Sequence, residues 1–197
     1  MTVKISPLEC SHAREVAQLH IQCISTGFIS SLGLNFVTSL YESIAQSESC
    51  FGCVAQKDQQ VIGFVAFTSD LNSLYRSVIK NKGFRFALLL TKKMFSWKNV
   101  KKIFQTLFYP RRVKQLDLPP AELLSVAVAP DQQGQGIANQ LIQNGLQQCS
   151  RHGLNDVKVL VAADNGPANK LYKKNGFELT SQILSHQVLS NLYIRKV

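Results

Sequence analysis

A single stretch, residues 122–141, most constrains what this chain can fold into. Residues 122–128 read ELLSVAV, a short apolar and β-branched run that is typical of a buried strand. Pro130 ends the run, and a polar loop containing Gly134 and Gly136 follows. Apolar residues then recur at helical spacing, at Ile137, Leu141, Ile142 and Leu146. The stretch therefore predicts a strand, a glycine loop and a helix in direct succession.

Such a succession is suited to binding phosphate. Glycine lets the backbone come close to a ligand. The first N–H groups of a helix have no partner within it, and the helix dipole places partial positive charge there. The absence of Gly-Lys-Ser/Thr excludes a Walker loop, and the glycines are too few and too closely set for a dinucleotide fingerprint.

Two motifs, in this order, resemble those of the GNAT acetyltransferases. Residues 133–138, QGQGIA, resemble the Gln/Arg-x-x-Gly-x-Gly/Ala signature of that family. Residues 165–178, NGPANKLYKKNGFE, resemble its second motif, with Tyr172 seven residues after Asn165. The resemblance covers residues 1–197 but is specific only over 121–139 and 165–178. It implies an α/β (α+β) fold, in which a mixed, mostly antiparallel central sheet of about seven strands is flanked by helices.

The rest of the chain is consistent with one domain, residues 1–197, built from short strands and amphipathic helices. Asp58 to Gln60 read as the turn of a hairpin. The predicted helices are 12–23, a second helix through residues 36–44, the helix after the glycine loop, and 165–175. The predicted strands are 3–5, 50–55, 61–68, the run beginning at 122, 155–162, 177–184 and 188–194.

A basic helical insertion, residues 71–118, precedes the fourth predicted strand. Twelve Lys and Arg side chains and no acidic residue lie between Leu71 and Leu116, against ten bases and twelve acids elsewhere, so this segment carries the whole net charge of +10. Four interpretations remain open: a helical cap with a solvated basic face, a lid that attracts an anionic acceptor, a peripheral membrane-surface patch, and a homodimer contact. We expect no nucleic-acid partner, because the aromatic residues here have core-like spacing.

Composition argues for a soluble cytoplasmic protein without a resident metal. We find no signal peptide and no run long enough to span a membrane. The five cysteines are an odd number and do not form a secreted framework. Cys50 and Cys53 form a CxxC without a second pair or a histidine cluster, so we interpret the cysteines as small buried apolar residues.

The resemblance implies acetyl-CoA as the acetyl donor. It places the pantetheine arm along the backbone of the strand and the pyrophosphate on the backbone N–H groups of the glycine loop and first helical turn. The implied cofactor-binding residues are Val126, Ala127, Val128, Gln133, Gly134, Gln135, Gly136, Ile137, Ala138, Asn139 and Asn165.

Acetyl transfer to an amine needs a base for the ammonium and an acid for the leaving thiolate. The resemblance makes Tyr172 the candidate acid. In some family members a glutamate base lies where this chain has Leu160. Alignment with the histone-acetylating branch instead makes Glu122 the candidate base, acting directly or through water. His20 and His186 are weaker alternatives.

The acceptor pocket is expected beside the loop between the first two helices. The candidate substrate-binding residues there are Phe28, Ile29 and Ser30, with Ser125 on the strand. Residues 27–33 and the basic insertion loosely resemble acetyltransferases of surface-polysaccharide gene clusters, which act on nucleotide-linked amino sugars.

The sequence therefore predicts an N-acetyltransferase that acts by direct attack in a ternary complex. Its acceptor is expected to be a small-molecule amine, with a nucleotide-linked amino sugar as the specific hypothesis. The open alternatives are a protein lysine or N-terminal acetyltransferase, and a CoA-binding scaffold that docks to a membrane or partner through residues 71–118.

Overall fold

Within the described residues, seven strands form one sheet, the number expected from the resemblance, and their order is β1-β2-β3-β4-β5-β7-β6. The computed structural model describes residues 2–25, 27–77, 118–185 and 188–197. Every neighbouring pair of strands is antiparallel except β4 and β5, which are parallel. The strands are β1 (Lys4–Pro7), β2 (Cys50–Lys57), β3 (Gln60–Thr68), β4 (Glu122–Val128), β5 (Asp156–Ala162), β6 (Glu178–Ser185) and β7 (Val188–Lys196).

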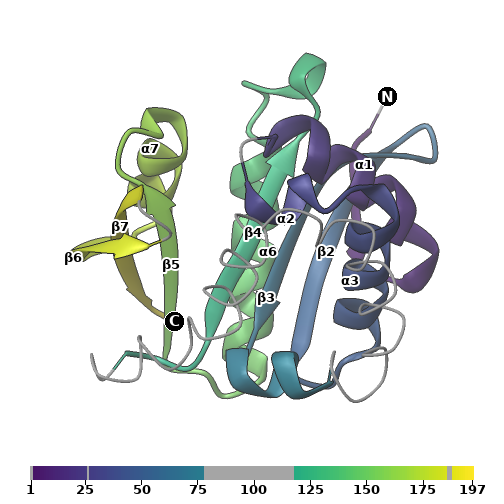
Figure 1. Cartoon of the computed structure of the whole chain (residues 1–197). Coiled ribbons are helices and arrows are strands. Elements are labelled where there is room, and N and C mark those ends of the chain that lie inside the picture. Colours follow the sequence, from purple (N-terminus) through teal and green to yellow (C-terminus); the bar gives the residue numbers. More distant parts are fainter. Residues whose placement is uncertain (1, 26, 78–117, 186–187) are drawn as a thin grey trace.

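Helices cover both faces of the sheet (Figure 1). They are α1 (Ala13–Cys23), α2 (Phe28–Ser31), α3 (Leu34–Gln46), α6 (Ile137–Arg151) and α7 (Gly166–Lys174), with short 3-10 turns at Cys10–His12 and Pro130–Gln132. Residues 71–77 are also helical, at the start of the predicted insertion. The remaining predicted helices of the insertion, and the membrane and dimer contacts hypothesised for it, lie outside the described residues.

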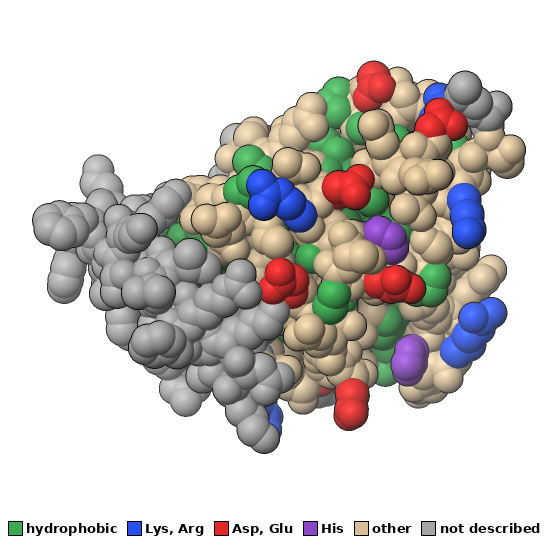
Figure 2. All heavy atoms as spheres, turned by 90° about the vertical axis from the view of Figure 1, so that its right-hand side faces the viewer, with side chains coloured by type: hydrophobic (Ala, Val, Ile, Leu, Met, Phe, Trp, Pro, Cys, Tyr) green, Lys and Arg blue, Asp and Glu red, His purple; other side chains and the backbone are tan. Residues whose placement is uncertain are grey.

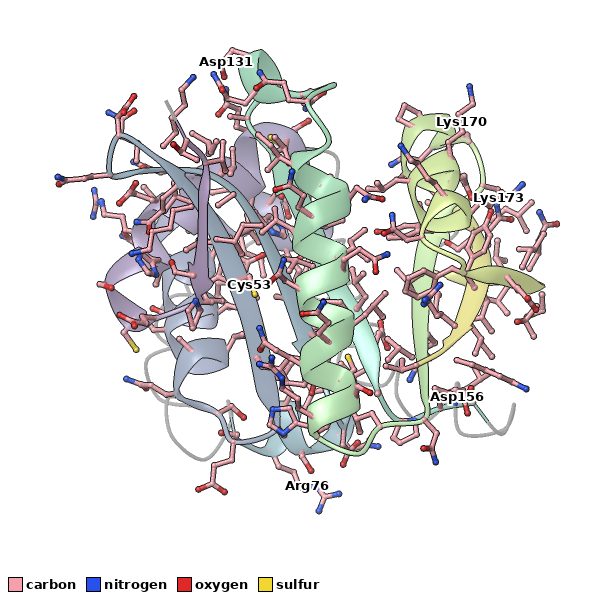
Figure 3. The ribbon with its side chains drawn as sticks, turned by 180° about the vertical axis from the view of Figure 1, so that it is seen from behind. Cys53, Arg76, Asp131, Asp156, Lys170 and Lys173 are labelled. Atoms are coloured by element: carbon pink, nitrogen blue, oxygen red, sulfur yellow. The ribbon has the colours of Figure 1, made fainter. Side chains whose placement is uncertain are left out.

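The strands alternate between two apolar clusters because successive side chains of a strand point to opposite faces. In β3, Val65 and Phe67 pack in the cluster that contains α6, whereas Phe64 and Ala66 pack in the cluster that contains α1 and α3. From behind, α6 lies along the sheet on the face opposite to α1 and α3 (Figure 3). The sheet therefore separates an α6 face from an α1–α3 face.

The hairpin between β2 and β3 confirms the turn predicted from the sequence. Asp58 and Gln59 form a two-residue hairpin turn and both have positive φ, 52° and 66°, as a turn matched to strand twist requires. Gly63 is a close-approach position, since a Cβ there would lie 3.1 Å from Leu141 of α6.

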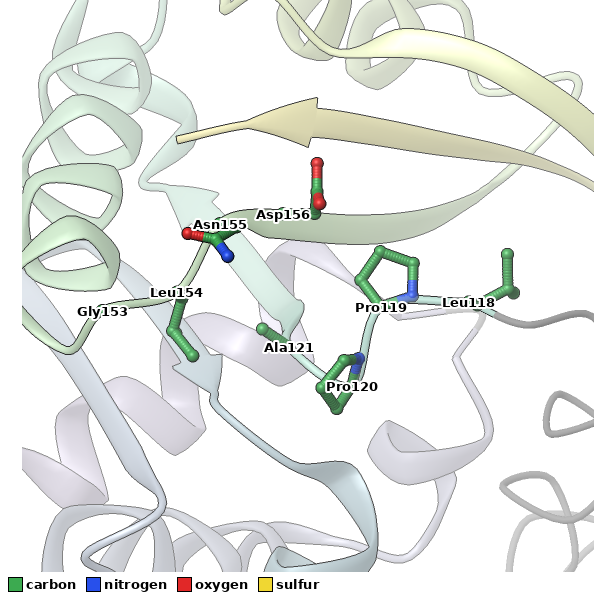
Figure 4. A pocket seen from close by; sticks show the side chains of 8 residues that line it. All are labelled: Leu118, Pro119, Pro120, Ala121, Gly153, Leu154, Asn155 and Asp156. Atoms are coloured by element: carbon green, nitrogen blue, oxygen red, sulfur yellow. The ribbon is translucent and has the colours of Figure 1, made fainter.

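Where β4 begins, helix α6 ends and β5 begins, the protein has a pocket of about 460 Å³ (Figure 4). Its lining is Leu118, Pro119, Pro120, Ala121, Gly153, Leu154, Asn155 and Asp156. It therefore lies at the C-terminal end of α6, and none of the predicted site residues lines it.

Candidate active site

The glycine loop has the geometry of an anion-binding helix start. Gly134 and Gly136 both have positive φ, 77° and 80°, which favours glycine, and a Cβ on either would point into open space. Gly136 is the N-cap of α6, and the first turn carries no acidic residue. The amide of Gln140 makes the helical bond to the Gly136 carbonyl, so the amides before it have no partner within the helix. These amides can receive a phosphate.

Gln133 holds the loop onto the end of β4. Its side-chain Nε2 donates to the carbonyl oxygen of Val128 at 3.0 Å. The Cys23 thiol, at the end of α1, donates to the same oxygen at 3.4 Å. Gln133 therefore shapes the loop through its side chain, a role that its place in the motif alone does not specify.

The sheet opens between β4 and β5 immediately before this loop. One register pair, Glu122 with Lys158, makes up their parallel ladder within the described residues. Beyond it the two strands separate (Figure 1). The amide of Ala129 donates to Ile62 of β3, so by alternation the backbones of Val128 and Val126 face the opening and that of Ala127 faces β3. Of the three predicted pantetheine-contact residues, Val126 thus turns its backbone groups toward the opening and Val128 turns its amide there, while the Val128 carbonyl accepts from Gln133 and Cys23.

A β-bulge in β4 decides where Ser125 points. The register of β3 against β4 shifts between Ala66 and Phe67, which pair with Ser125 and Leu123 and leave Leu124 as the extra residue. Ser125 consequently lies on the α1–α3 face, where its Oγ is 2.9 Å from the Tyr41 hydroxyl. Simple alternation counted forward from Leu123 would have placed it on the α6 face.

The Tyr41 hydroxyl also lies 2.8 Å from Nδ1 of His20, so a chain of hydrogen bonds runs from α1 through α3 to β4. His20 and Tyr41 are both buried. Burial lowers the pKa of His20 to about 4, so its imidazole is neutral near pH 7. The sequence indicated His20 only as a weak alternative base and Tyr41 only as part of a helix face.

The segment between α1 and α3 forms the short helix α2, which the sequence pattern did not predict. Ser30 is buried and its hydroxyl donates to the Ile24 carbonyl at 2.6 Å. Phe28 and Ile29 remain partly exposed. Of the three residues predicted here to bind substrate, Phe28 and Ile29 expose apolar surface, whereas the Ser30 hydroxyl is engaged in a hydrogen bond within the fold.

Glu122 is buried and ion-paired on the α1–α3 face. Its Oε2 lies 3.6 Å from Nζ of Lys158, beyond hydrogen-bond range, and has no hydrogen-bond partner in the described chain. Lys158 Nζ donates to the carbonyls of Pro119 and Pro120. Burial raises the pKa of the Glu122 carboxyl, and the nearby Lys158 charge opposes that shift. A raised carboxyl pKa suits a general base.

Helix α7 brings Tyr172 to the α6 face. The ring is buried against Phe177 and Tyr193. Burial raises the pKa of the phenol, which keeps it protonated and able to donate. Asn165 is the N-cap of α7, its Oδ1 accepting from the Ala168 amide at 3.2 Å. Its observed contact is therefore the helix cap.

Asn169 is a buried polar residue whose role the sequence did not reveal. Its Nδ2 donates to three carbonyls, those of Ala162, Ala163 and Asn165, and its Oδ1 accepts from Asn191 at 2.7 Å and Tyr193 at 2.8 Å. These bonds fasten α7 to β5 and β7 and so fix the position of Tyr172. The sequence signal that could have identified this role is the presence of a polar residue at a core-facing position of the helix.

Charge and cysteine chemistry contribute little to the described part of the site. On the face seen in Figure 2, acidic, basic and hydrophobic side chains are interspersed. Lys170 and Lys173 of α7 are exposed (Figure 3). All five cysteines are free; Cys10 is exposed and Cys23 half-buried, which corrects the expectation that all are buried. Among the described residues, no helix is long and apolar enough to cross a membrane, and no cluster of three metal-ligating side chains occurs.

Comparison with known proteins identifies the family of the chain. Residues 25–177 match the family described as Acetyltransferase (GNAT) family. The chain is 42% identical over 60 residues to a mycothiol acetyltransferase of Saccharomonospora viridis, a match that covers 30% of this chain and 20% of that protein. It thus spans about one fifth of the length of the curated relatives it matches.

Solved structures share the fold at low identity. Arabidopsis thaliana NAA60 in complex with acetyl-CoA superposes with a TM-score of 0.63 at 17% identity, covering 100% of this chain and 99% of that one. The ribosomal-protein-S18-alanine N-acetyltransferase of Escherichia coli superposes with a TM-score of 0.58 at 15% identity, covering 98% and 91%.

Proposed function

This chain belongs to the GNAT acetyltransferase family, and from that premise we propose that it transfers the acetyl group of acetyl-CoA to a primary amine by direct attack in a ternary complex. The observation that carries the proposal is the parallel β4–β5 ladder, one residue pair long, which opens directly into the glycine loop of α6. An open strand edge leading to unpaired helix amides suits a long ligand that ends in phosphates.

The cofactor binds along this edge. The pyrophosphate takes the free amides at the start of α6, and the helix dipole favours its negative charge. The pantetheine arm pairs with the backbone of Val126 and with the amide of Val128, which face the opening. Gln133 keeps the loop in position through Val128, and Asn165 supports the start of α7.

The two candidate catalytic groups, Glu122 and Tyr172, lie on opposite faces of the sheet. This arrangement suits a reaction in which acetyl-CoA and the amine enter from opposite sides. Glu122, on the α1–α3 face, takes a proton from the acceptor ammonium directly or through water. The freed amine attacks the thioester carbonyl, and the carbon–sulfur bond breaks. Tyr172, on the α6 face, gives its proton to the leaving thiolate and regains one from the product nitrogen, which loses its second proton as the amide forms.

The acceptor is a small-molecule amine. Relatives with 36–42% identity over short segments are named mycothiol acetyltransferase, which supports a small acceptor over a protein. The finer hypothesis is a nucleotide-linked amino sugar, since the insertion contains twelve bases and no acid between Leu71 and Leu116. Phe28 and Ile29 supply partly exposed apolar surface beside this acceptor.

A thiol-release assay tests the proposal. Acetyl-CoA is incubated with the protein and, in turn, a UDP-linked amino sugar, glucosamine, free lysine and a peptide that begins with alanine. We expect the highest kcat/KM with the UDP-linked sugar. Binding of acetyl-CoA by calorimetry without transfer to any of the four amines would instead support the scaffold hypothesis.

Two substitutions test the catalytic roles. We expect Glu122→Gln and Tyr172→Phe each to lower kcat about 100-fold, the scale of one general acid or base, with acetyl-CoA affinity nearly intact. Exposed Glu178 offers a matched control, since Glu178→Gln removes a carboxylate away from the site. Wild-type turnover in either variant would remove the assigned role.

A further inference from the structure

The hydrogen-bond chain His20–Tyr41–Ser125 links three elements and ends on Ser125, which is partly exposed. Its two bonds are 2.8 Å and 2.9 Å long, and its inner members are buried. Ser125 retains partial exposure on the α1–α3 face because the bulge at Leu124 turns it there. Phe64 of β3 stacks on the His20 ring and edge-packs against Tyr41, so aromatic surface surrounds the inner bond.

The direction of this chain follows from the other nitrogen of His20. Nε2 is buried and has no hydrogen-bond partner in the described part of the chain. A buried N–H without a partner is rarer and more costly than an unused lone pair. The proton of the neutral imidazole therefore belongs on Nδ1, which donates to the Tyr41 oxygen.

Each donor then fixes the next one. Because the Tyr41 oxygen accepts from His20, its own hydrogen is directed to Ser125 Oγ. The Ser125 hydrogen is left to point away from Tyr41. Within the described residues no protein acceptor for it is recorded, and the hydroxyl lies where β4 leaves its ladder with β5.

We propose that His20 and Tyr41 position the Ser125 hydroxyl as a hydrogen-bond donor to an oxygen of the acceptor substrate, adjacent to its reacting amine. This inference rests on the proposed acetyl transfer and assigns a selectivity to it. A hydroxyl or carbonyl oxygen beside the amine is recognised, as in an amino sugar, and a plain alkylamine is not. His20 and Tyr41 are positioning residues, since they act through Ser125.

The face of the sheet identifies the ligand as the acceptor and not the cofactor. Helix α6, proposed above to bind the pyrophosphate, packs on the opposite face, and the proposed cofactor contacts use the backbone of Val126 and Val128. Ser125 shares its face with Glu122, the candidate base for the acceptor amine. A donor at this place orients the amine before attack.

Kinetics of Tyr41→Phe and Ser125→Ala test the proposal, with the best amine of the panel above as substrate. We expect each variant to lower kcat/KM for the amine about tenfold, mainly through KM, and to leave acetyl-CoA affinity unchanged. In the Ser125→Ala background, Tyr41→Phe should have no further effect. Independent, additive losses, or a loss of acetyl-CoA affinity, would overturn the proposal.

Substrate comparison sharpens the test. Wild type should prefer glucosamine, which has hydroxyls beside its amine, over cyclohexylamine, which has none, and Ser125→Ala should reduce this preference. Ser43→Ala is the matched control, because it removes a buried hydroxyl of α3 that donates to the Ser39 carbonyl at 2.8 Å. We expect it to leave kcat/KM unchanged.

A measurement without turnover separates this inference from the proposed function. The imidazole ¹⁵N–¹H spectrum shows which nitrogen of His20 carries the proton, and the spectrum of His20→Asn assigns its signals. Protonated Nδ1 is expected whether or not any amine is acetylated. Protonated Nε2 would reverse the direction of the chain and overturn the inference even in an active enzyme.

Discussion

Two buried polar networks, one on each side of the β4–β5 opening, differ in how they end. The Asn169 network joins α7, β5 and β7 and leaves no polar atom of Asn169, Asn191 or Tyr193 without a partner. Within the part of the chain that the structure describes, the His20 network leaves Nε2 without a hydrogen-bond partner at one end and ends at the other on the partly exposed residue Ser125. A closed network serves stability, whereas an open one directs a group toward something else.

The largest expected effect is on the closed network. Asn169→Ala removes five hydrogen bonds. It also takes away the acceptor of the buried Asn191 amide and of the Tyr193 hydroxyl. We expect a loss of about 4 kcal/mol in the free energy of unfolding, measured by urea denaturation. A loss below about 1 kcal/mol would mean that the network is not a structural fastener.

A smaller loss in the free energy of unfolding is expected at acid pH, where His20 of the open network titrates. The unfolded pKa of His20 is 6.5 and the folded value is about 4. Between these pH values the unfolded chain binds the proton that the folded one does not, so stability falls as pH drops, by about 3 kcal/mol in total. His20→Asn, which keeps a donor and cannot titrate, should flatten this slope in urea denaturation at stepped pH. Equal slopes in both proteins would contradict the burial of a neutral His20.

The smallest expected effect comes from removing one tyrosine hydroxyl, and it distinguishes the two networks. Tyr193→Phe deletes a bond to Asn169 that matches the His20–Tyr41 bond in length, 2.8 Å in each case. Because Asn191 still donates to the Asn169 Oδ1, we expect a stability loss of about 1 kcal/mol and a smaller loss of kcat/KM than in Tyr41→Phe. Tyr41→Phe should show the larger kinetic loss. A kinetic defect in Tyr193→Phe alone would invert the comparison.

Local pattern predicted the elements of this fold well. The alternation of Val65 and Phe67 with Phe64 and Ala66 marks a strand buried on both faces, and the hairpin at Asp58 follows from its flanking apolar runs. The short helix α2 was missed because four residues are too few to show a helical period.

The candidate site was only partly accessible from the sequence. The glycine loop was predicted because backbone positions with positive φ favour glycine, so Gly134 and Gly136 mark the loop in the sequence. Lys158 was not identified as the partner of Glu122, since the two residues meet only through pairing of β4 with β5. The direction of Ser125 depends on a bulge that no local signal marks.

By itself, the sequence determined the strand–loop–helix unit and the order of its motifs, because glycine conformations and side-chain periods are properties of neighbouring residues. Only the tertiary structure decided that β4 and β5 pair at one residue and then part, and that Ser125 joins His20 and Tyr41. Strand pairing and buried hydrogen bonds join residues far apart in the chain. Their energies are set by packing across the sheet, which neighbouring residues along the chain do not encode.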